Sequence, residues 1–107
     1  MLIVLTTTQN IEEAESLAEK IVESELASCV QILPPIRSVY FWERAIQKET
    51  EHLLLIKTLE EKYEELEKFI KENHSYEVPE IVAVKSEKIS AGYLGWMKEY
   101  LEGSLKQ

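Results

Sequence analysis

The residues best suited to chemistry lie in the segment from Asn73 to Glu80, which is rich in polar and aromatic side chains. His74, Glu77 and Glu80 could supply nitrogen and oxygen ligands to a borderline divalent ion such as copper or zinc. Their spacing matches no closed structural zinc motif. The alternative is that His74 terminates a helix and interacts with its last carbonyl groups.

Cys29 is the only cysteine, so no disulfide can form within the chain. A reactive or metal-binding thiol needs a nearby cation or a helix N-terminus to lower its pKa. The sequence places neither beside Cys29, which favours a buried structural cysteine over a metal ligand. A single unpaired thiol fits the reducing cytoplasm best.

Aromatic and basic side chains provide two further candidate groups. Aromatic residues could line a pocket at a subunit junction or simply pack at an interface, where such residues are enriched. They are Tyr40, Trp42, Tyr76 and Trp96. Basic residues on the expected strands could form a small anion-attracting patch, although each alone is typical of a solvated strand position. They are Arg37, Lys57 and Lys85.

No catalytic motif is present. Glycine occurs only at positions 92, 95 and 103, so a glycine-rich phosphate loop is excluded, and there is no nucleophile elbow, paired-cysteine motif or HExxH. The net charge of −8, with 20 acidic and 12 basic residues, argues against a nucleic-acid partner. No apolar run reaches the ~18 residues of a membrane span. A non-enzymatic, cytoplasmic protein is expected.

Hydrophobic periodicity predicts alternating strands and helices. Capping boxes at Asn10–Glu13 and at Thr58–Glu61 indicate where the first two helices begin, and Ser90 is the expected cap of the last one. The predicted strands are Leu2–Thr7, Ser28–Leu33, Ile36–Glu43, Glu51–Lys57 and Glu80–Val84, with Arg44–Thr50 as a polar turn. The predicted helices run from Ile11 to Leu26, from Leu59 to Ile70 and from Tyr93 to Leu101.

This order predicts an α+β fold over residues 1–107 as one domain. The economical arrangement is a split strand-helix-strand sandwich with two helices on one face of an antiparallel sheet and an extra C-terminal helix. The hairpin formed by Ser28–Glu43 and Glu51–Thr58 is too long for two helices to cover, and the opposite sheet face has no element assigned to it. Burial against sister subunits, as a trimer or a dimer, would cover both.

Several motifs together resemble the CutA divalent-cation-tolerance family across almost the whole chain. They are Leu26-Ala27-Ser28-Cys29-Val30, Tyr40-Phe41-Trp42-Glu43, Leu55-Ile56-Lys57-Thr58, the His74–Ile81 loop and Tyr93-Leu94-Gly95-Trp96. The resemblance implies a ferredoxin-like fold and a compact cytoplasmic homotrimer, similar to the nitrogen-regulatory signalling trimers. It also implies a link to tolerance of divalent metals, copper above all. His74 matches the loop histidine of the family, and Cys29 matches its strand cysteine.

The chain departs from the family pattern at a few positions. Thr6 stands where some bacterial members have a cysteine, and Asn73 where they have a second histidine. Ser75 replaces the usual proline. The turn after Trp42 and Glu43 lacks its usual glycine, so a different turn conformation is expected.

We therefore expect a thermostable homotrimer that binds copper(II) or another divalent cation weakly and catalyses no reaction. Its metal ligands would be His74 first and Cys29 second, with Glu77 and Glu80 completing the site. Tyr40, Phe41 and Trp42 would pack between subunits. One alternative is a small-molecule signalling module with subunit clefts lined by the basic and aromatic residues above. The other is a structural scaffold without a ligand.

Overall fold

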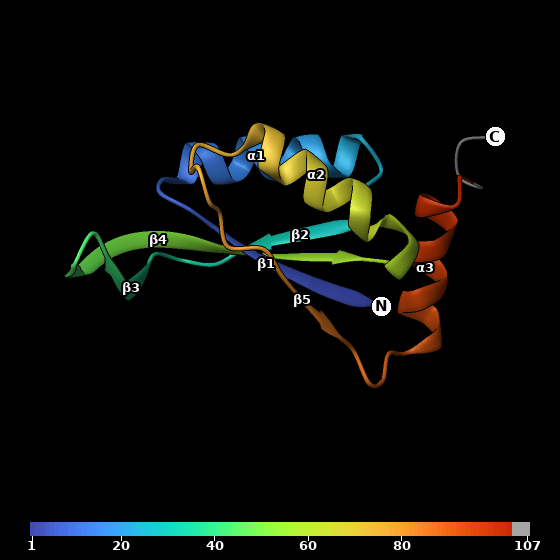
Figure 1. The fold of residues 1–107 in the computed structure, drawn as a ribbon. Coiled ribbons are helices and arrows are strands. Elements are labelled where there is room, and N and C mark those ends of the chain that lie inside the picture. The colour runs from blue at the N-terminus through green and yellow to red at the C-terminus, as the bar shows by residue number, and fades with distance from the viewer. Residues whose placement is uncertain (104–107) are drawn as a thin grey trace.

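The computed structural model describes residues 1–103 and has an α+β architecture, with helices packed on an antiparallel sheet (Figure 1). The strands pair in the order β2-β4-β1-β5, and β3 pairs with the distal half of β4. In chain order the elements are β1 (Leu2–Thr8), α1 (Ile11–Glu23), β2 (Cys29–Ile32), β3 (Ile36–Trp42), β4 (Ala45–Thr58), a 3-10 turn (Glu60–Lys62), α2 (Tyr63–Asn73), β5 (Val82–Lys85) and α3 (Ala91–Leu101).

The main core lies between one face of the sheet and the two helices α1 and α2. Strand alternation directs Val4 of β1 and Ile56 of β4 to this face, and both are fully buried. Leu17 and Ile21 meet them from α1, and Ile70 from α2. A smaller cluster under α3 closes the end of the sheet away from the hairpin (Figure 1).

The other sheet face carries no helix in the described part of the chain (Figure 1). Ile3 and Leu5 of β1 lie on this face half-buried, and their partners in β5, Val84 and Val82, are exposed. The sequence predicts such an uncovered apolar face, and the structure confirms it.

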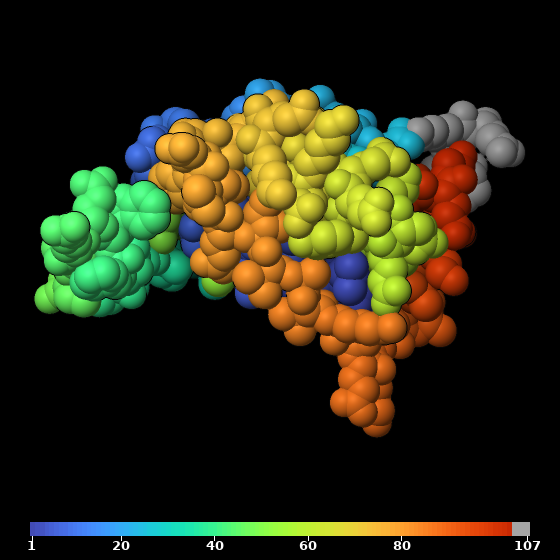
Figure 2. Space-filling view, in the orientation of Figure 1, coloured from blue at the N-terminus to red at the C-terminus, as the bar shows by residue number. Residues whose placement is uncertain are grey.

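The hairpin β3–β4 projects beyond the rest of the sheet, so that the described chain measures 51 × 27 × 24 Å. In Figure 2 it forms a separate green lobe beside the yellow-orange loop. The prediction of a polar turn over Arg44–Thr50 is wrong, because β4 begins at Ala45 and continues to Thr58. A two-residue turn at Glu43 and Arg44 suffices, since both adopt the left-handed backbone conformation, with φ of 50° and 62°, that twisted hairpins need.

The predicted helix starts are partly confirmed. Asn10 caps α1 by accepting a hydrogen bond from the backbone N–H of Glu13 at 2.8 Å, and Ser90 caps α3 in the same way through Tyr93. The capping box at Thr58 is wrong, because Thr58 is the last residue of β4 and its hydroxyl donates to the carbonyl of Leu26 at 2.7 Å. A buried hydroxyl that already serves the tertiary structure cannot cap a helix.

Two element ends also differ from prediction. Helix α1 ends at Glu23 rather than at Leu26, because Glu25 adopts a left-handed conformation with φ of 59°. Helix α2 continues to Asn73, so the loop before β5 begins at His74. Within residues 1–103, none of the helices combines the length and the apolar composition that crossing a membrane requires.

Candidate functional site

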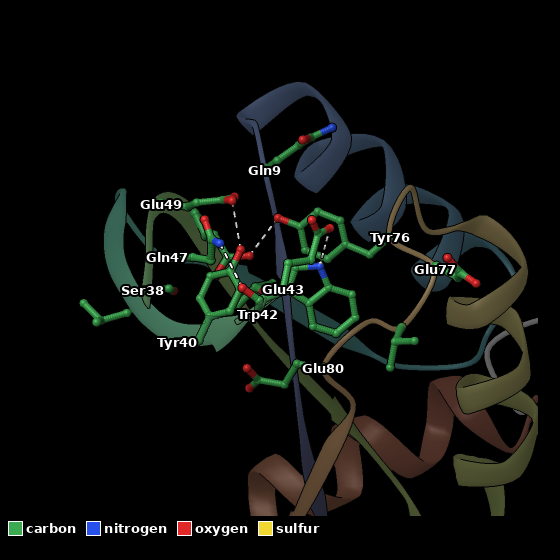
Figure 3. A pocket seen from close by; sticks show the side chains of 14 residues that line it. Gln9, Ser38, Tyr40, Trp42, Glu43, Gln47, Glu49, Tyr76, Glu77 and Glu80 are labelled. Carbon is green, nitrogen blue, oxygen red and sulfur yellow. Dashed lines mark hydrogen bonds between the residues drawn. The ribbon is translucent and has the colours of Figure 1, made fainter. Parts of the chain in front are cut away.

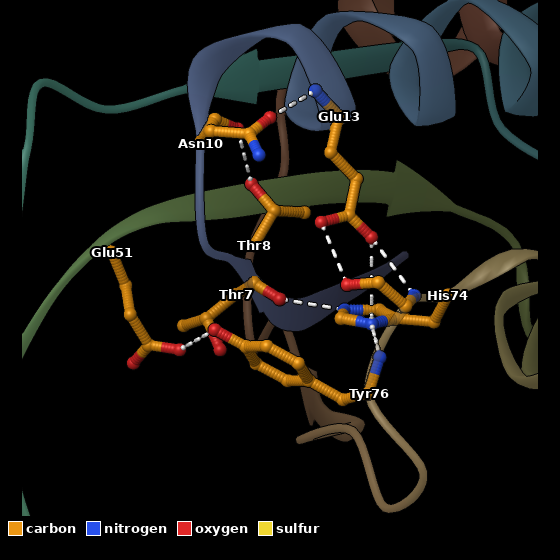
Figure 4. Close-up of polar contacts among 8 residues, drawn as sticks. Thr7, Thr8, Asn10, Glu13, Glu51, His74 and Tyr76 are labelled. Carbon is orange, nitrogen blue, oxygen red and sulfur yellow. Dashed lines mark hydrogen bonds and ion pairs between the residues drawn. The ribbon is translucent and has the colours of Figure 1, made fainter.

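His74 closes the corner between α2 and the end of β1. Its side chain is 0% exposed. The Nε2 atom lies 2.6 Å from the carbonyl oxygen of Thr7, and because a carbonyl can only accept, Nε2 carries the proton. The Nδ1 atom accepts a hydrogen bond from the backbone N–H of Tyr76 at 3.0 Å. Both ring nitrogens of His74 are therefore engaged (Figure 4).

Glu13 of α1 also holds the loop that follows α2, through hydrogen bonds to Ser75. Its two carboxylate oxygens accept hydrogen bonds from the backbone N–H and the hydroxyl of Ser75, each at 2.9 Å. This use explains why Glu13 does not reach back to complete the predicted capping box. One of its oxygens lies 3.7 Å from Nδ1 of His74, so a nitrogen and an oxygen ligand stand side by side (Figure 4).

Tyr76 connects the His74 corner to the hairpin. Its ring packs against that of His74 with 4.8 Å between centroids, and its hydroxyl donates to Oε2 of Glu51 at 2.7 Å. Burial, followed by the hydrogen bond to Glu51, raises the pKa of the Tyr76 hydroxyl above its usual value. The phenol therefore remains a hydrogen-bond donor throughout the physiological pH range.

A cleft of about 810 Å³ lies between one face of the hairpin and the loop that follows α2. Strand register explains its walls, since Tyr40 lies opposite Gln47, and Ser38 lies opposite Glu49, on the same face. Figure 3 shows these side chains directed towards Tyr76 of the loop. The lining comprises Thr7, Gln9, Ser38, Val39, Tyr40, Trp42, Glu43, Gln47, Glu49, Glu51, Tyr76, Glu77, Val78 and Glu80.

Hydrogen bonds fix the hairpin wall of this cleft. The hydroxyl of Tyr40 donates to Glu49 at 2.8 Å, and the indole N–H of Trp42 donates to Glu43 at 3.1 Å. The side-chain amide of Gln47 donates to the carbonyl of Trp42 at 3.0 Å. The wall therefore presents two aromatic rings whose polar atoms are tied to neighbouring carboxylates.

The cleft is acidic, because its lining contains five glutamates and no lysine, arginine or histidine. Two of the predicted metal ligands, Glu77 and Glu80, belong to this lining, whereas His74 does not. Among residues 1–103, no three side chains of the metal-binding types lie close enough together to hold an ion. The metal role predicted for His74, Glu77 and Glu80 stays a prediction.

Cys29 lies in a different place, at the start of β2. It is half-buried rather than part of the core, and it pairs with Lys57 of β4. Lys57 places its ammonium group 5.6 Å from the ring of Tyr93. Burial, and then the neighbouring Cys29, raise the pKa of the Tyr93 hydroxyl. Sequence reasoning missed the pairing of Lys57 with Cys29, because two strands that are distant in the sequence bring these residues together.

Cys29 and His74 are too far apart to share an ion within one chain. Cys29 and Ile3 of β1 both pair with Lys57 of β4, so they lie at the same position along the strand direction. His74 instead contacts Thr7, four residues further along β1, a distance of about 13 Å.

The predicted basic patch does not assemble within one chain. Arg37 donates to the hydroxyl of Thr50 at 3.4 Å, and Lys85 forms an ion pair with Glu60 at 2.8 Å, while Lys57 lies near Tyr93. Trp96 of α3 is 45% exposed and packs on Tyr93, with ring centroids 5.5 Å apart. It therefore takes no part in the acidic cleft.

Glu13, Glu49 and Glu51 are the site residues that sequence reasoning missed. The alternation of Ala45, Gln47, Glu49 and Glu51 indicates a polar strand face, whereas the polar composition of Arg44–Thr50 predicts a turn. The sequence distinguishes Glu13 only as part of a capping box, which predicts a local role rather than its bonds to Ser75.

Comparison with known proteins gives a consistent match. A family model described as CutA1 divalent ion tolerance protein matches residues 2–100. Over 97 residues the chain is 41% identical to the rice protein CutA 1, chloroplastic, and the match covers 91% of this chain but only 55% of that one. It is 38% identical to the divalent-cation tolerance protein CutA of Thermus thermophilus, covering 91% of this chain and 94% of that protein. The chain thus spans about half the length of the plant relative and nearly all of the bacterial one.

Solved structures agree with this match. The crystal structure of CutA1 from Oryza sativa has a TM-score of 0.90 at 40% identity, covering 92% of this chain and 91% of that one. The divalent cation tolerance protein of Thermus thermophilus gives 0.89 at 38% identity, covering 94% and 98%. A structure from Archaeoglobus fulgidus, described as a periplasmic divalent cation tolerance protein, gives 0.90 at 36% identity, covering 94% and 99%.

Proposed function

The chain belongs to the CutA1 divalent ion tolerance protein family, and from this premise we propose that it acts in divalent-cation tolerance by binding the cation reversibly, without catalysis. The observation that carries the proposal is the pairing of Nδ1 of His74 with a carboxylate oxygen of Glu13 at 3.7 Å. An imidazole nitrogen and a carboxylate oxygen suit copper(II) and other borderline divalent ions.

The geometry favours weak binding. Nδ1 of His74 offers its lone pair to the N–H of Tyr76, and Glu13 holds Ser75, so a cation must displace hydrogen bonds of the loop. A site that must first be opened binds with reduced apparent affinity. Cys29 is the second candidate ligand, as a separate site about 13 Å away. Glu77 and Glu80 are candidates only if the loop rearranges towards His74.

Calorimetric titration of the full chain with Cu(II) tests the proposal, and the second histidine provides a matched control. His74→Gln removes the proposed ligand, whereas His52→Gln removes a histidine that lies 3.1 Å from the carbonyl of Leu33, away from Glu13. We expect His74→Gln to lower the affinity about tenfold or more and His52→Gln to leave it unchanged. Equal isotherms for all three proteins would show that His74 does not bind Cu(II).

Glu13→Gln is a second variant that retains the helix cap, because Asn10 bonds the backbone rather than the side chain of Glu13. It should also weaken Cu(II) binding. Unchanged Cu(II) affinity in a folded Glu13→Gln protein would contradict the two-ligand arrangement. Cys29→Ser distinguishes the separate thiol site, since it should leave the His74 isotherm intact.

A ferredoxin-like homotrimer is part of the same proposal. It is supported by the uncovered sheet face and by Phe41 and Ile46, an opposed pair on the hairpin that is 69% and 63% exposed. Light scattering should give three times the 12.4 kDa of one chain. A mass of 12.4 kDa would contradict assembly. Cytoplasmic location remains a proposal that rests on the single unpaired cysteine.

A further inference from the structure

We propose that Tyr76 couples the cation site at His74 to the base of the hairpin, so that binding of the cation releases the loop of residues 74–80 from β4. The inference rests on the proposed function, because it concerns the same two ligands, His74 and Glu13. It adds a positioning residue, Tyr76, and a direction of regulation. The docked loop opposes the cation, and the cation opposes docking of the loop.

The ring of His74 cannot serve the loop and a cation at the same time. Nε2 donates its proton to the carbonyl oxygen of Thr7 at 2.6 Å, so Nδ1 carries the only available lone pair of the ring. That lone pair accepts a hydrogen bond from the backbone N–H of Tyr76 at 3.0 Å. The other tautomer would point one N–H group at another. Cation binding at Nδ1 and the hydrogen bond from Tyr76 therefore exclude each other.

Glu13 presents the same conflict at the neighbouring residue of the loop. Its Oε2 atom, which lies 3.7 Å from Nδ1 of His74, accepts a hydrogen bond from the backbone N–H of Ser75 at 2.9 Å. Metal-to-ligand distances of about 2 Å on each side would place an ion between Nδ1 and Oε2. Such an ion takes the acceptors from the N–H groups of two successive residues, Ser75 and Tyr76 (Figure 4). A backbone N–H that loses its acceptor needs another, which favours movement of the loop towards solvent.

Tyr76 transmits this movement to β4. Its hydroxyl donates to Oε2 of Glu51, a residue 25 positions earlier, at 2.7 Å. Among residues 1–103 this is the only side-chain hydrogen bond between the loop and the hairpin, and Figure 3 shows Tyr76 beside the hairpin wall. The bond has the short length typical of a hydroxyl that donates to a carboxylate. Displacement of the Tyr76 backbone therefore lengthens or breaks it.

Glu51 lies where the hairpin leaves the rest of the sheet. It pairs with Ile36, at the first position of the β3–β4 ladder. The next residue, His52, pairs with Thr8 at the last position of the β1–β4 ladder. The hydrogen bond from Tyr76 thus holds the loop against the base of the hairpin, which projects as a separate lobe in Figure 2.

Coupling between two binding equilibria is reciprocal. If the cation weakens docking of the loop, a weakened dock must strengthen cation binding by the same factor. A variant without the bond from Tyr76 to Glu51 should therefore bind the cation more tightly than the wild type, although its fold is less stable. Structural damage alone would lower the affinity or leave it unchanged. The sign of the change in affinity separates coupling from a purely structural role of Tyr76.

Calorimetric titration of the full chain with Cu(II), at a fixed protein concentration, tests the coupling. Tyr76→Phe keeps the ring and the backbone N–H but removes the hydroxyl, and we expect the Cu(II) affinity to rise about threefold to tenfold. Tyr63→Phe is the matched control, because the hydroxyl of Tyr63 donates to Glu67 at 3.1 Å within α2. Its Cu(II) affinity should stay within about twofold of the wild type, since that bond does not hold the loop.

His74→Gln separates this inference from the function on which it rests. If His74→Gln weakens Cu(II) binding while Tyr76→Phe binds no more tightly than the wild type, the cation site stands and the coupling is wrong. If His74→Gln has no effect, the cation site and the coupling are both wrong. If Tyr63→Phe gains as much affinity as Tyr76→Phe, the gain reflects a general loosening of the fold and the coupling is again wrong.

Hydrogen exchange of the wild-type chain locates the movement. With saturating Cu(II), the backbone N–H groups of residues 74–80 and of the hairpin base around Glu51 should exchange at least about threefold faster, because local opening sets the exchange rate. Exchange in α3 should not change, and His74→Gln should show no Cu(II)-induced change in the loop. Slower exchange of the loop with Cu(II) would show that the cation closes the loop instead of releasing it, which would overturn the proposal.

Discussion

His74 and Glu51 both contact Tyr76, and both have largely buried side chains, yet their surroundings differ. His74 is 0% exposed and has both ring nitrogens in hydrogen bonds, to Thr7 and from Tyr76. Glu51, at 8% exposure, has one hydrogen-bond donor and no cationic partner in the described chain. Burial of an ionisable group therefore does not by itself mark a binding residue.

The difference predicts unequal costs when the contacts of the two residues are removed. A cation at His74 competes with hydrogen bonds that hold the loop onto β1 and α1. Glu51 instead accepts one hydrogen bond, from Tyr76, and forms no ion pair with another residue of the described chain. Removing the His74 ring should therefore lower the stability of the fold more than removing the hydroxyl group that binds Glu51.

The largest expected effect is that of His74→Ala on stability. Removing the ring deletes two hydrogen bonds and leaves a cavity between β1, α1 and the loop, which should lower the free energy of unfolding by about 3 kcal/mol. Urea denaturation at fixed protein concentration measures it, because subunit association makes apparent stability concentration-dependent. His52→Ala is the control and should cost about 1 kcal/mol, since His52 is only partly buried. A similar loss of unfolding free energy in both variants would show that His74 stabilises the fold no more than His52 does.

Tyr76→Phe should have the next largest effect, because it removes the one donor that Glu51 has. A buried carboxylate that loses its only hydrogen bond should cost about 2 kcal/mol of unfolding free energy. Tyr63→Phe is a matched control, since the hydroxyl of Tyr63 donates to Glu67 at 3.1 Å within α2, away from the cleft. It should cost less than about 1 kcal/mol. Equal costs would mean that water already solvates Glu51.

The same tyrosine predicts an alkaline pH dependence. The folded state raises the pKa of Tyr76 above the unfolded value of 10.0, so the stabilisation is complete below that pH and is lost as pH rises through the folded pKa. Wild-type unfolding free energy should therefore begin to fall as pH approaches 10.0 and should continue to fall above it, and less steeply in Tyr76→Phe. Tyr40, Tyr63 and Tyr93 also have raised pKa values and contribute the slope that remains. Identical slopes in both proteins would contradict the role of Tyr76.

The fold was largely predictable because its signals are local. Leu17 and Ile21 repeat at helical spacing, and Asn10 and Ser90 cap helices through residues only three positions away. The distal hairpin was not, because the polar residues of β4 resemble a turn until β3 pairs with them. No local pattern predicts that Glu43 and Arg44 both take the left-handed conformation without a glycine.

The sequence predicts which types of residue form the site, but not which residues they contact. The sequence marks His74 as a candidate ligand, but its partner Thr7 lies 67 positions earlier and is brought near only by the sheet. The alternation of polar residues could indicate the strand face of Glu51, but no local signal indicates its burial, since that depends on the loop carrying Tyr76. The capping-box pattern even assigns Glu13 a local role, whereas its carboxylate binds Ser75, 62 positions away.

Glu13→Gln should have the smallest effect on the free energy of unfolding, and it tests how Glu13 holds the loop after α2. Glutamine keeps one carbonyl acceptor for Ser75 but replaces the second acceptor with an amide donor, so one of the two hydrogen bonds at 2.9 Å is lost. We expect a loss of about 1 kcal/mol in urea denaturation. Glu12→Gln is the control, because Glu12 is an exposed neighbour in the same first turn and contributes a similar charge to the helix N-terminus. If the two variants lose equal stability, Glu13 acts through the helix dipole alone and the loop is held by His74. If Glu13→Gln costs as much as His74→Ala, the carboxylate and the imidazole act as one unit, and a cation that displaces either would release the loop.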